Sequence, residues 1–80
     1  MTFADAYARL SELGFNRVSV TLSSRLDGRV HAVTWEAHHP EMVHDRLAAM
    51  IEFHQAPKEG DIEGMCRHMV QSAEKWMSTK

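Results

Sequence analysis

Hydrophobic residues recur every three to four positions near both ends of the chain and every second position in an early central stretch. In residues 2–13, five apolar side chains fall on one helical face: Phe3, Ala6, Tyr7, Leu10 and Leu13. Such spacing is typical of an amphipathic helix. Thr2 can cap its first turn, and Gly14 can end it because glycine accepts positive φ. The pattern predicts a first helix over residues 2–13.

A hairpin follows the first helix. From residue 16 the period changes to two, as in a strand exposed on one side. Asp27-Gly28 is a strong signal for a two-residue turn, and a second strand extends from Arg29 to about Ala37. This turn pairs Leu22 with Val33, Val20 with Trp35 and Val18 with Ala37. The apolar pairs therefore share one face, which a one-residue shift of register would disrupt.

Two more helices are expected after the hairpin. Pro40 lies in the first turn of a helix that ends near Pro57, because proline costs little at a helix start. Its apolar face contains Val43, Leu47, Met50, Ile51 and His54. The last helix, residues 61–78, has the clearest apolar stripe. The prediction is a single α+β domain over residues 1–80, helix–β-hairpin–helix–helix, with the helices packed on one face of a two-stranded antiparallel sheet.

Composition excludes several classes of protein. The 80 residues are 44% hydrophobic and 25% charged, with a formal net charge of −2. A strongly basic nucleic-acid binder and an acidic nucleic-acid mimic are both excluded by this balance. Cys66 is the only cysteine, so no internal disulfide forms, which suits a reducing cytoplasm. With no membrane-length apolar run and no signal peptide, we expect a cytoplasmic protein that does not contact membranes.

Six histidines raise the question of a metal site. His38, His39 and His44 cluster with Glu41, but no second pair of ligands completes a di-metal set. Cys66 and His68 are two residues apart, so their side chains diverge by about 200° on a helix. No catalytic constellation or phosphate-binding loop can be assembled. We expect no metal, no cofactor and no enzymatic activity.

Charge is distributed unevenly along the chain. Three arginines lie in the hairpin, whereas residues 41–63 hold six acidic residues against two basic ones. The expected binding residues are on the exposed hairpin face and on the second helix: Arg17, Thr21, Arg25, Arg29, His31, Glu41, Asp45 and Glu52. A two-stranded sheet also leaves unpaired edges, which can pair with a partner strand or with a copy of the same chain.

In general character the chain resembles the small phage and mobile-element proteins that inhibit host defence, the anti-CRISPR proteins in particular. The likeness lies in the short chain without disulfides, the hairpin VSVTLSSRLDGRVHAVTWEA and the helices without a recognisable active site. It implies an inhibitor that binds a CRISPR effector complex and occludes its nucleic-acid or protein docking surface. The alternative is a small dimeric nucleic-acid-binding regulator that uses the arginine-bearing hairpin. A monomer and a homodimer through the hairpin both remain open.

Overall fold

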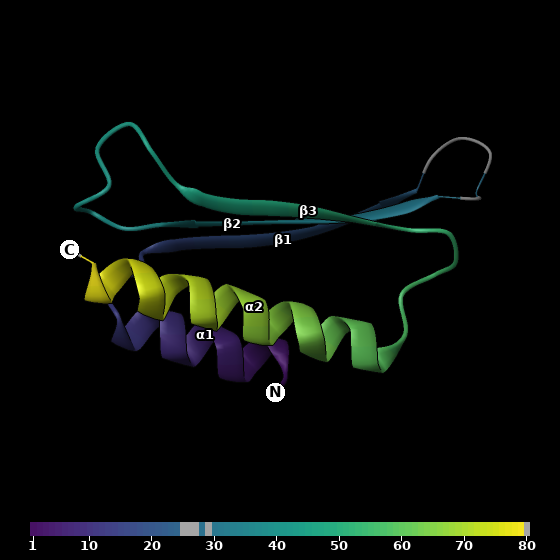
Figure 1. Ribbon diagram of the computed structural model, residues 1–80, viewed down its shortest axis with the longest axis horizontal. Coiled ribbons are helices and arrows are strands. Elements are labelled where there is room, and N and C mark those ends of the chain that lie inside the picture. Colours follow the sequence, from purple (N-terminus) through teal and green to yellow (C-terminus); the bar gives the residue numbers. More distant parts are fainter. Residues whose placement is uncertain (25–27, 29, 80) are drawn as a thin grey trace.

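The computed structural model describes residues 1–24, 28 and 30–79 as two layers, an antiparallel sheet and a pair of helices that cover one of its faces (Figure 1). The elements in chain order are α1 (Phe3–Glu12), β1 (Arg17–Ser24), β2 (His31–His38), β3 (Leu47–Phe53) and α2 (Glu59–Ser78). The sheet has the order β1-β2-β3, and both pairs are antiparallel. The α+β class is confirmed, but the predicted two-stranded sheet with three helices is wrong.

The first helix is confirmed within one residue of its predicted start and end, with Thr2 and Leu13 as its caps. The Thr2 hydroxyl accepts a hydrogen bond from the Asp5 amide (3.1 Å), and the Asp5 carboxylate accepts one from the Thr2 amide (3.0 Å). This reciprocal pair satisfies two amides that have no partner within the helix. Gly14 follows the helix with a φ of +95°, a conformation that side chains with a Cβ rarely adopt.

The predicted hairpin register is confirmed over the described residues. Val18, Val20 and Leu22 face the β2 residues with which the sequence pairs them, in a register that runs from Arg17–His38 to Ser24–His31. Gly28 has a φ of +69°, as a tight turn requires. The predicted turn residue Asp27 and the neighbouring pairs of the hairpin tip lie outside the described residues.

The predicted helix over residues 40–57 is wrong, because residues 47–53 form the third strand. Their burial alternates residue by residue, with Leu47, Ala49, Ile51 and Phe53 on the half-buried side. The same apolar residues also fit a helical face, so periodicity alone could not separate the two. Pairing with β2 favours the strand over the helix. Without this third strand, β2 would be an edge strand, although it carries the buried Trp35.

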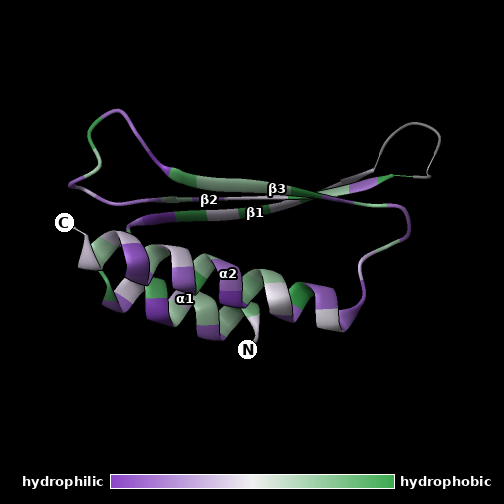
Figure 2. Cartoon of the chain, in the orientation of Figure 1, coloured by the Kyte–Doolittle hydropathy of each residue, from purple (hydrophilic) through white to green (hydrophobic). Residues whose placement is uncertain are grey.

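Hydrophobic residues recur along both layers (Figure 2), and the core lies where the layers meet. Its largest fully buried side chains are Trp35, Leu10, Met69, Val33 and Cys66.

The helices run parallel, since the Met1 ammonium pairs with Glu63 and Arg9 pairs with Glu74, both at 3.2 Å. The last helix is confirmed within two residues of its predicted start. Within the described part of the chain, no helix is long and apolar enough to cross a membrane.

Candidate functional site

The face of the sheet that points away from the helices is open. Val33, Trp35 and Ala37 are buried against the helices, and alternate residues of a strand point to opposite faces. The register then assigns eleven residues to the other face, which we call the open face: Arg17, Ser19, Thr21, Ser23, Ala32, Thr34, Glu36, His38, Ala48, Met50 and Glu52. In Figure 1 both helices lie on the opposite side of the sheet.

Short side chains dominate the open face. Three rows cross the sheet from β1 to β3: Ser23–Ala32–Glu52, Thr21–Thr34–Met50 and Ser19–Glu36–Ala48. Serine, threonine and alanine project little above the backbone, so another surface can approach closely. Met50 is the large apolar exception, and it is 63% exposed. Methionine adapts its shape to irregular surfaces, which suits it to contact a partner.

Charged groups gather at one end of the open face. The Glu36 carboxylate lies 3.0 Å from Nε of Arg46 and 3.6 Å from Nε2 of His38. Arg17 opposes His38 across the first strand pair. Exposed ion pairs of this kind add little to stability, but they orient an approaching partner through complementary charge.

The structure brings together three of the predicted binding residues. Arg17 and Thr21 lie on the outward side of β1, and Glu52 lies on the same face of β3. His31 points to the helix-covered side, since it is two residues from the buried Val33, and its Nδ1 lies 2.9 Å from Oγ of Ser24. These four residues are therefore divided between the two faces of the sheet.

The predicted acidic surface on a second helix is wrong. Glu41 and Asp45 lie in the connection between β2 and β3, and Glu52 is on a strand. The reason is the pairing of residues 47–53 with β2, which leaves residues 39–46 to cross between strands. The Asp45 carboxylate accepts a hydrogen bond from the Arg46 amide (2.7 Å). Arg25 and Arg29 lie outside the described residues.

His39, considered above only as a metal ligand, has a structural role at the end of β2. Its Nδ1 accepts a hydrogen bond from the Glu41 amide (3.1 Å), so Nε2 carries the proton and donates to the Leu13 carbonyl (3.2 Å). The ring packs against Phe15 and Trp76, with centroids 5.1 and 5.0 Å away. His39 thus joins the end of β2 to both helices, and its two nitrogens are already used.

Neither the histidines nor the cysteine assemble a reactive site in the described structure. Among residues 1–24, 28 and 30–79, no group of three His, Cys, Asp or Glu side chains could hold a metal ion. Cys66 is fully buried between the helices beside Ala6 and Val70. Burial raises the pKa of its thiol, which disfavours the nucleophilic thiolate.

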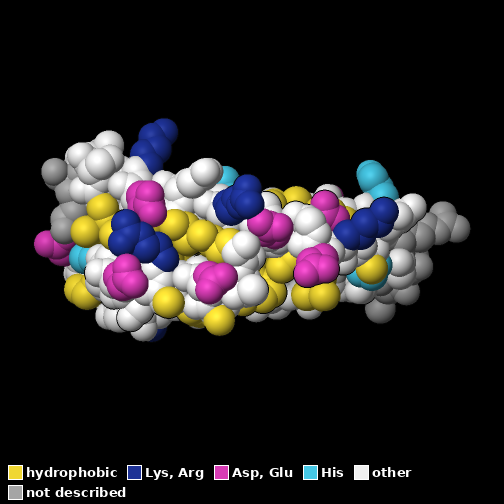
Figure 3. Space-filling model, turned by 90° about the horizontal axis from the view of Figure 1, so that it is seen from below, with side chains coloured by type: hydrophobic (Ala, Val, Ile, Leu, Met, Phe, Trp, Pro, Cys, Tyr) yellow, Lys and Arg dark blue, Asp and Glu magenta, His cyan; other side chains and the backbone are white. Residues whose placement is uncertain are grey.

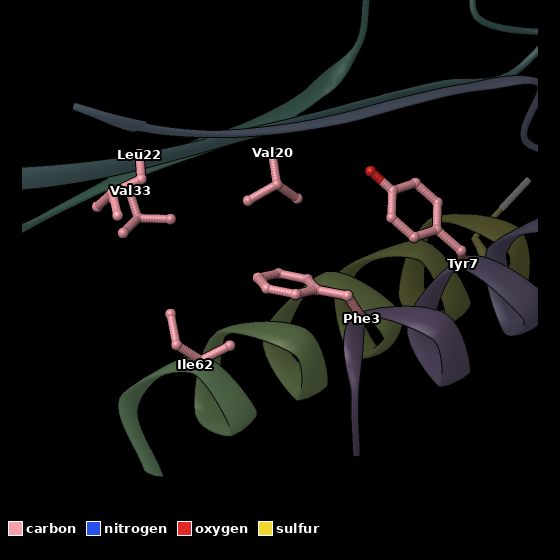
Figure 4. A pocket seen from close by; sticks show the side chains of 6 residues that line it. All are labelled: Phe3, Tyr7, Val20, Leu22, Val33 and Ile62. Atoms are coloured by element: carbon pink, nitrogen blue, oxygen red, sulfur yellow. The ribbon is translucent and has the colours of Figure 1, made fainter. Parts of the chain in front are cut away.

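A second surface, missed by the sequence analysis, lies beside the edge strand β1. An apolar groove of about 340 Å³ opens there between the strand and the N-terminal halves of the helices (Figure 4). It is lined by Phe3, Tyr7, Val20, Leu22, Val33 and Ile62. Helical spacing placed Phe3 and Tyr7 on the apolar face of the first helix, but their side chains are 36% and 40% exposed. We call this surface the β1 groove.

Comparisons with protein families, curated proteins and solved structures found no match to this chain.

Proposed function

We propose that this chain is a non-enzymatic binding protein that docks its open face onto a protein partner. The observation that carries the proposal is the open face itself, three strands wide and free of helices on that side (Figure 1). A sheet of this size normally needs only one covered face for stability. The second face is then available to a partner without any change in the fold.

Met50 is the expected anchor of this contact. It lies in the row Thr21–Thr34–Met50, between Ala48 and Glu52 on the same face of β3, and is 63% exposed. Interfaces concentrate their binding energy in a few large side chains surrounded by near-neutral contacts. The open face has one large flexible apolar group, Met50, and most of the other side chains on it are short.

The first partner class to test is a CRISPR effector complex. This choice follows from the general resemblance to anti-CRISPR proteins, and it predicts a stoichiometric inhibitor that occludes a docking surface. The ion-paired end of the open face, with Glu36, Arg46 and Arg17, would set the orientation of docking.

Direct nucleic-acid binding has less support from the three described arginines outside the hairpin. Arg9, Arg46 and Arg67 each pair with a glutamate, at 3.2, 3.0 and 2.6 Å respectively. On the helix side of the molecule, basic and acidic side chains lie next to one another (Figure 3). A phosphate backbone favours unpaired cations that release its counterions, so these residues suit it poorly.

Affinity capture tests the proposal. The full chain is immobilised and presented with purified CRISPR effector complexes and, separately, with duplex and single-stranded nucleic acid. We expect capture of an effector at fixed stoichiometry. Failure to capture any effector would overturn the partner class, and nucleic acid captured alone would favour the regulator.

The substitution Met50→Asp tests the surface. It should weaken partner binding by about tenfold or more, because it places a charge at the centre of the contact. Val43→Asp is the matched control, since Val43 is 73% exposed but lies in the β2–β3 connection. Equal affinities for the two variants, measured by biolayer interferometry, would show that the open face is not the docking surface.

A further inference from the structure

β1 is an edge strand with apolar side chains exposed beside it. Its only strand neighbour among the described elements is β2. Leu22 is 60% exposed, and it lines the β1 groove together with Phe3 and Tyr7 of α1 (Figure 4). Unpaired strand edges and exposed apolar side chains both favour association with another chain.

The free hydrogen-bonding groups of β1 belong to its even-numbered residues. The Val18 carbonyl accepts a hydrogen bond from the Tyr7 hydroxyl (3.4 Å), so it points toward α1 and away from β2. Successive residues of a strand direct their backbone groups to opposite edges. Val20 and Leu22 therefore present their amide and carbonyl groups at the free edge, where a further strand could pair with them.

The five residues of β1 centred on Thr21 have a symmetric pattern. Thr21 is flanked by Val20 and Leu22, and these in turn by Ser19 and Ser23. An antiparallel copy centred on Thr21 would place Thr21 opposite Thr21, Val20 opposite Leu22 and Ser19 opposite Ser23. The threonine and serine pairs then lie on the open face, and the Val20–Leu22 pairs lie on the helix-covered face. Threonine pairs are favourable across strands, and Val20 opposite Leu22 joins two apolar side chains.

We propose that the chain forms a homodimer in which β1 pairs antiparallel with β1 of a second copy, centred on Thr21. The two sheets join into one, with the helices of both copies on the same side. Val20 and Leu22 of each copy meet over the two β1 grooves, which become a single covered apolar interior. Leu22 loses its exposure to water, and the open face of each copy remains free.

The other edge of the sheet lacks these features. The inward-facing residues of β3, Leu47, Ala49, Ile51 and Phe53, are already half-buried in the core. The groove and its exposed aromatic residues lie along β1 alone in the described part of the chain. A second copy at the β1 edge therefore buries apolar area that a copy at the β3 edge would not.

Small residues on α1 leave space for the second copy. Phe3 and Tyr7 line the β1 groove, and at 100° per residue Ala4, Ala8 and Ser11 occupy the next part of the helix surface, beyond the edge of β1. All three are exposed. Two α1 helices brought together under the joined sheets can thus approach without a clash of long side chains.

Sedimentation equilibrium of the full chain tests the dimer. The expected mass is twice the 9.1 kDa of one chain, and Leu22→Asp should weaken the dimer at least about tenfold by placing a carboxylate in the apolar seam. Leu22 is exposed in the single chain, so this variant is expected to fold, which circular dichroism checks. Met50→Asp, on the open face, should leave the dimer intact.

A chain that is still monomeric at about 100 μM would overturn the proposal, since the dissociation constant would then be too high for a specific dimer.

Cysteine substitution tests the register. In a pair centred on Thr21, the two Thr21 Cα atoms lie about 4.5 Å apart, within reach of a disulfide. Thr21→Cys should cross-link into a covalent dimer under mild oxidation. Ser23→Cys, on the same face, should not, because its two copies are about 13 Å apart along the strands. Cross-linking of Ser23→Cys instead of Thr21→Cys would overturn the register. Neither result depends on partner capture, so the dimer and the proposed function fail separately.

Discussion

At the scale of single residues, a few side chains and one glycine determine how the elements meet. Gly14 turns the chain from α1 into β1, and a Cβ built on it would lie 2.8 Å from Nε2 of His39. That nitrogen is also the donor to the Leu13 carbonyl. The position therefore excludes a side chain twice, through its φ of +95° and through the imidazole beside it.

Gly14→Ala is expected to lower the free energy of unfolding by about 1–3 kcal/mol, through left-handed strain and displacement of His39. Gly60→Ala is the control, because nothing lies within 4 Å of its Cβ and the residue is in the first turn of α2. That variant should be neutral or stabilising by up to about 1 kcal/mol. Urea denaturation measures both, and equal stabilities would contradict the role given to Gly14.

At the scale of elements, the sequence predicted those whose signals are local. The Thr2–Asp5 capping pair marks the start of α1, and alternation in β1 with a turn at Gly28 specifies the hairpin. Residues 47–53 carry no comparable marker, because their apolar positions fit a strand and a helix equally well. Long-range pairing with β2 resolved that ambiguity, and it moved Glu52 from a predicted helix to the open face.

Ala48→Val tests the identity of β3. Ala48 is exposed and opposes Glu36 on β2, so a β-branched residue there should raise the free energy of unfolding, by up to about 1 kcal/mol. In a helix the same change would lower it by about 0.5 kcal/mol. Gln71→Val, at an exposed position of α2, provides the helical control and should be destabilising. Thermal denaturation of the two variants shows whether each substitution raises or lowers the free energy of unfolding.

At the scale of the whole molecule, ion pairs tie the two parallel helices together on their exposed side. Glu63 lies 3.2 Å from the Met1 ammonium and 2.6 Å from Arg67. The hydrogen bond and charge of the N-terminus, with a further contribution from Arg67, lower the pKa of the Glu63 carboxyl. Hydrogen bonds from Thr2 lower the pKa of Asp5 in the same way.

Acid should therefore destabilise the fold through these two carboxyls. Each has a lower pKa in the folded chain than in the unfolded chain, so the unfolded state binds more protons as the pH falls. The stabilisation is fully present above the unfolded pKa, near 4, and is lost as the pH falls through the folded pKa. Glu63→Gln should reduce the difference in denaturation midpoint between pH 7 and pH 3. An unchanged difference would show that the pair with Met1 does not contribute in solution.

The sequence by itself determined the two helices next to the chain ends and the hairpin register. These follow from capping, periodicity and turn residues, which act over a few positions of the chain. Only the tertiary structure decided that β3 is a strand, that Phe3 and Tyr7 border an open groove, and that Arg17, Thr21 and Glu52 share a face. Each of these three features depends on how segments that are far apart in the chain pack against one another. Patterns over a few neighbouring residues therefore could not predict them.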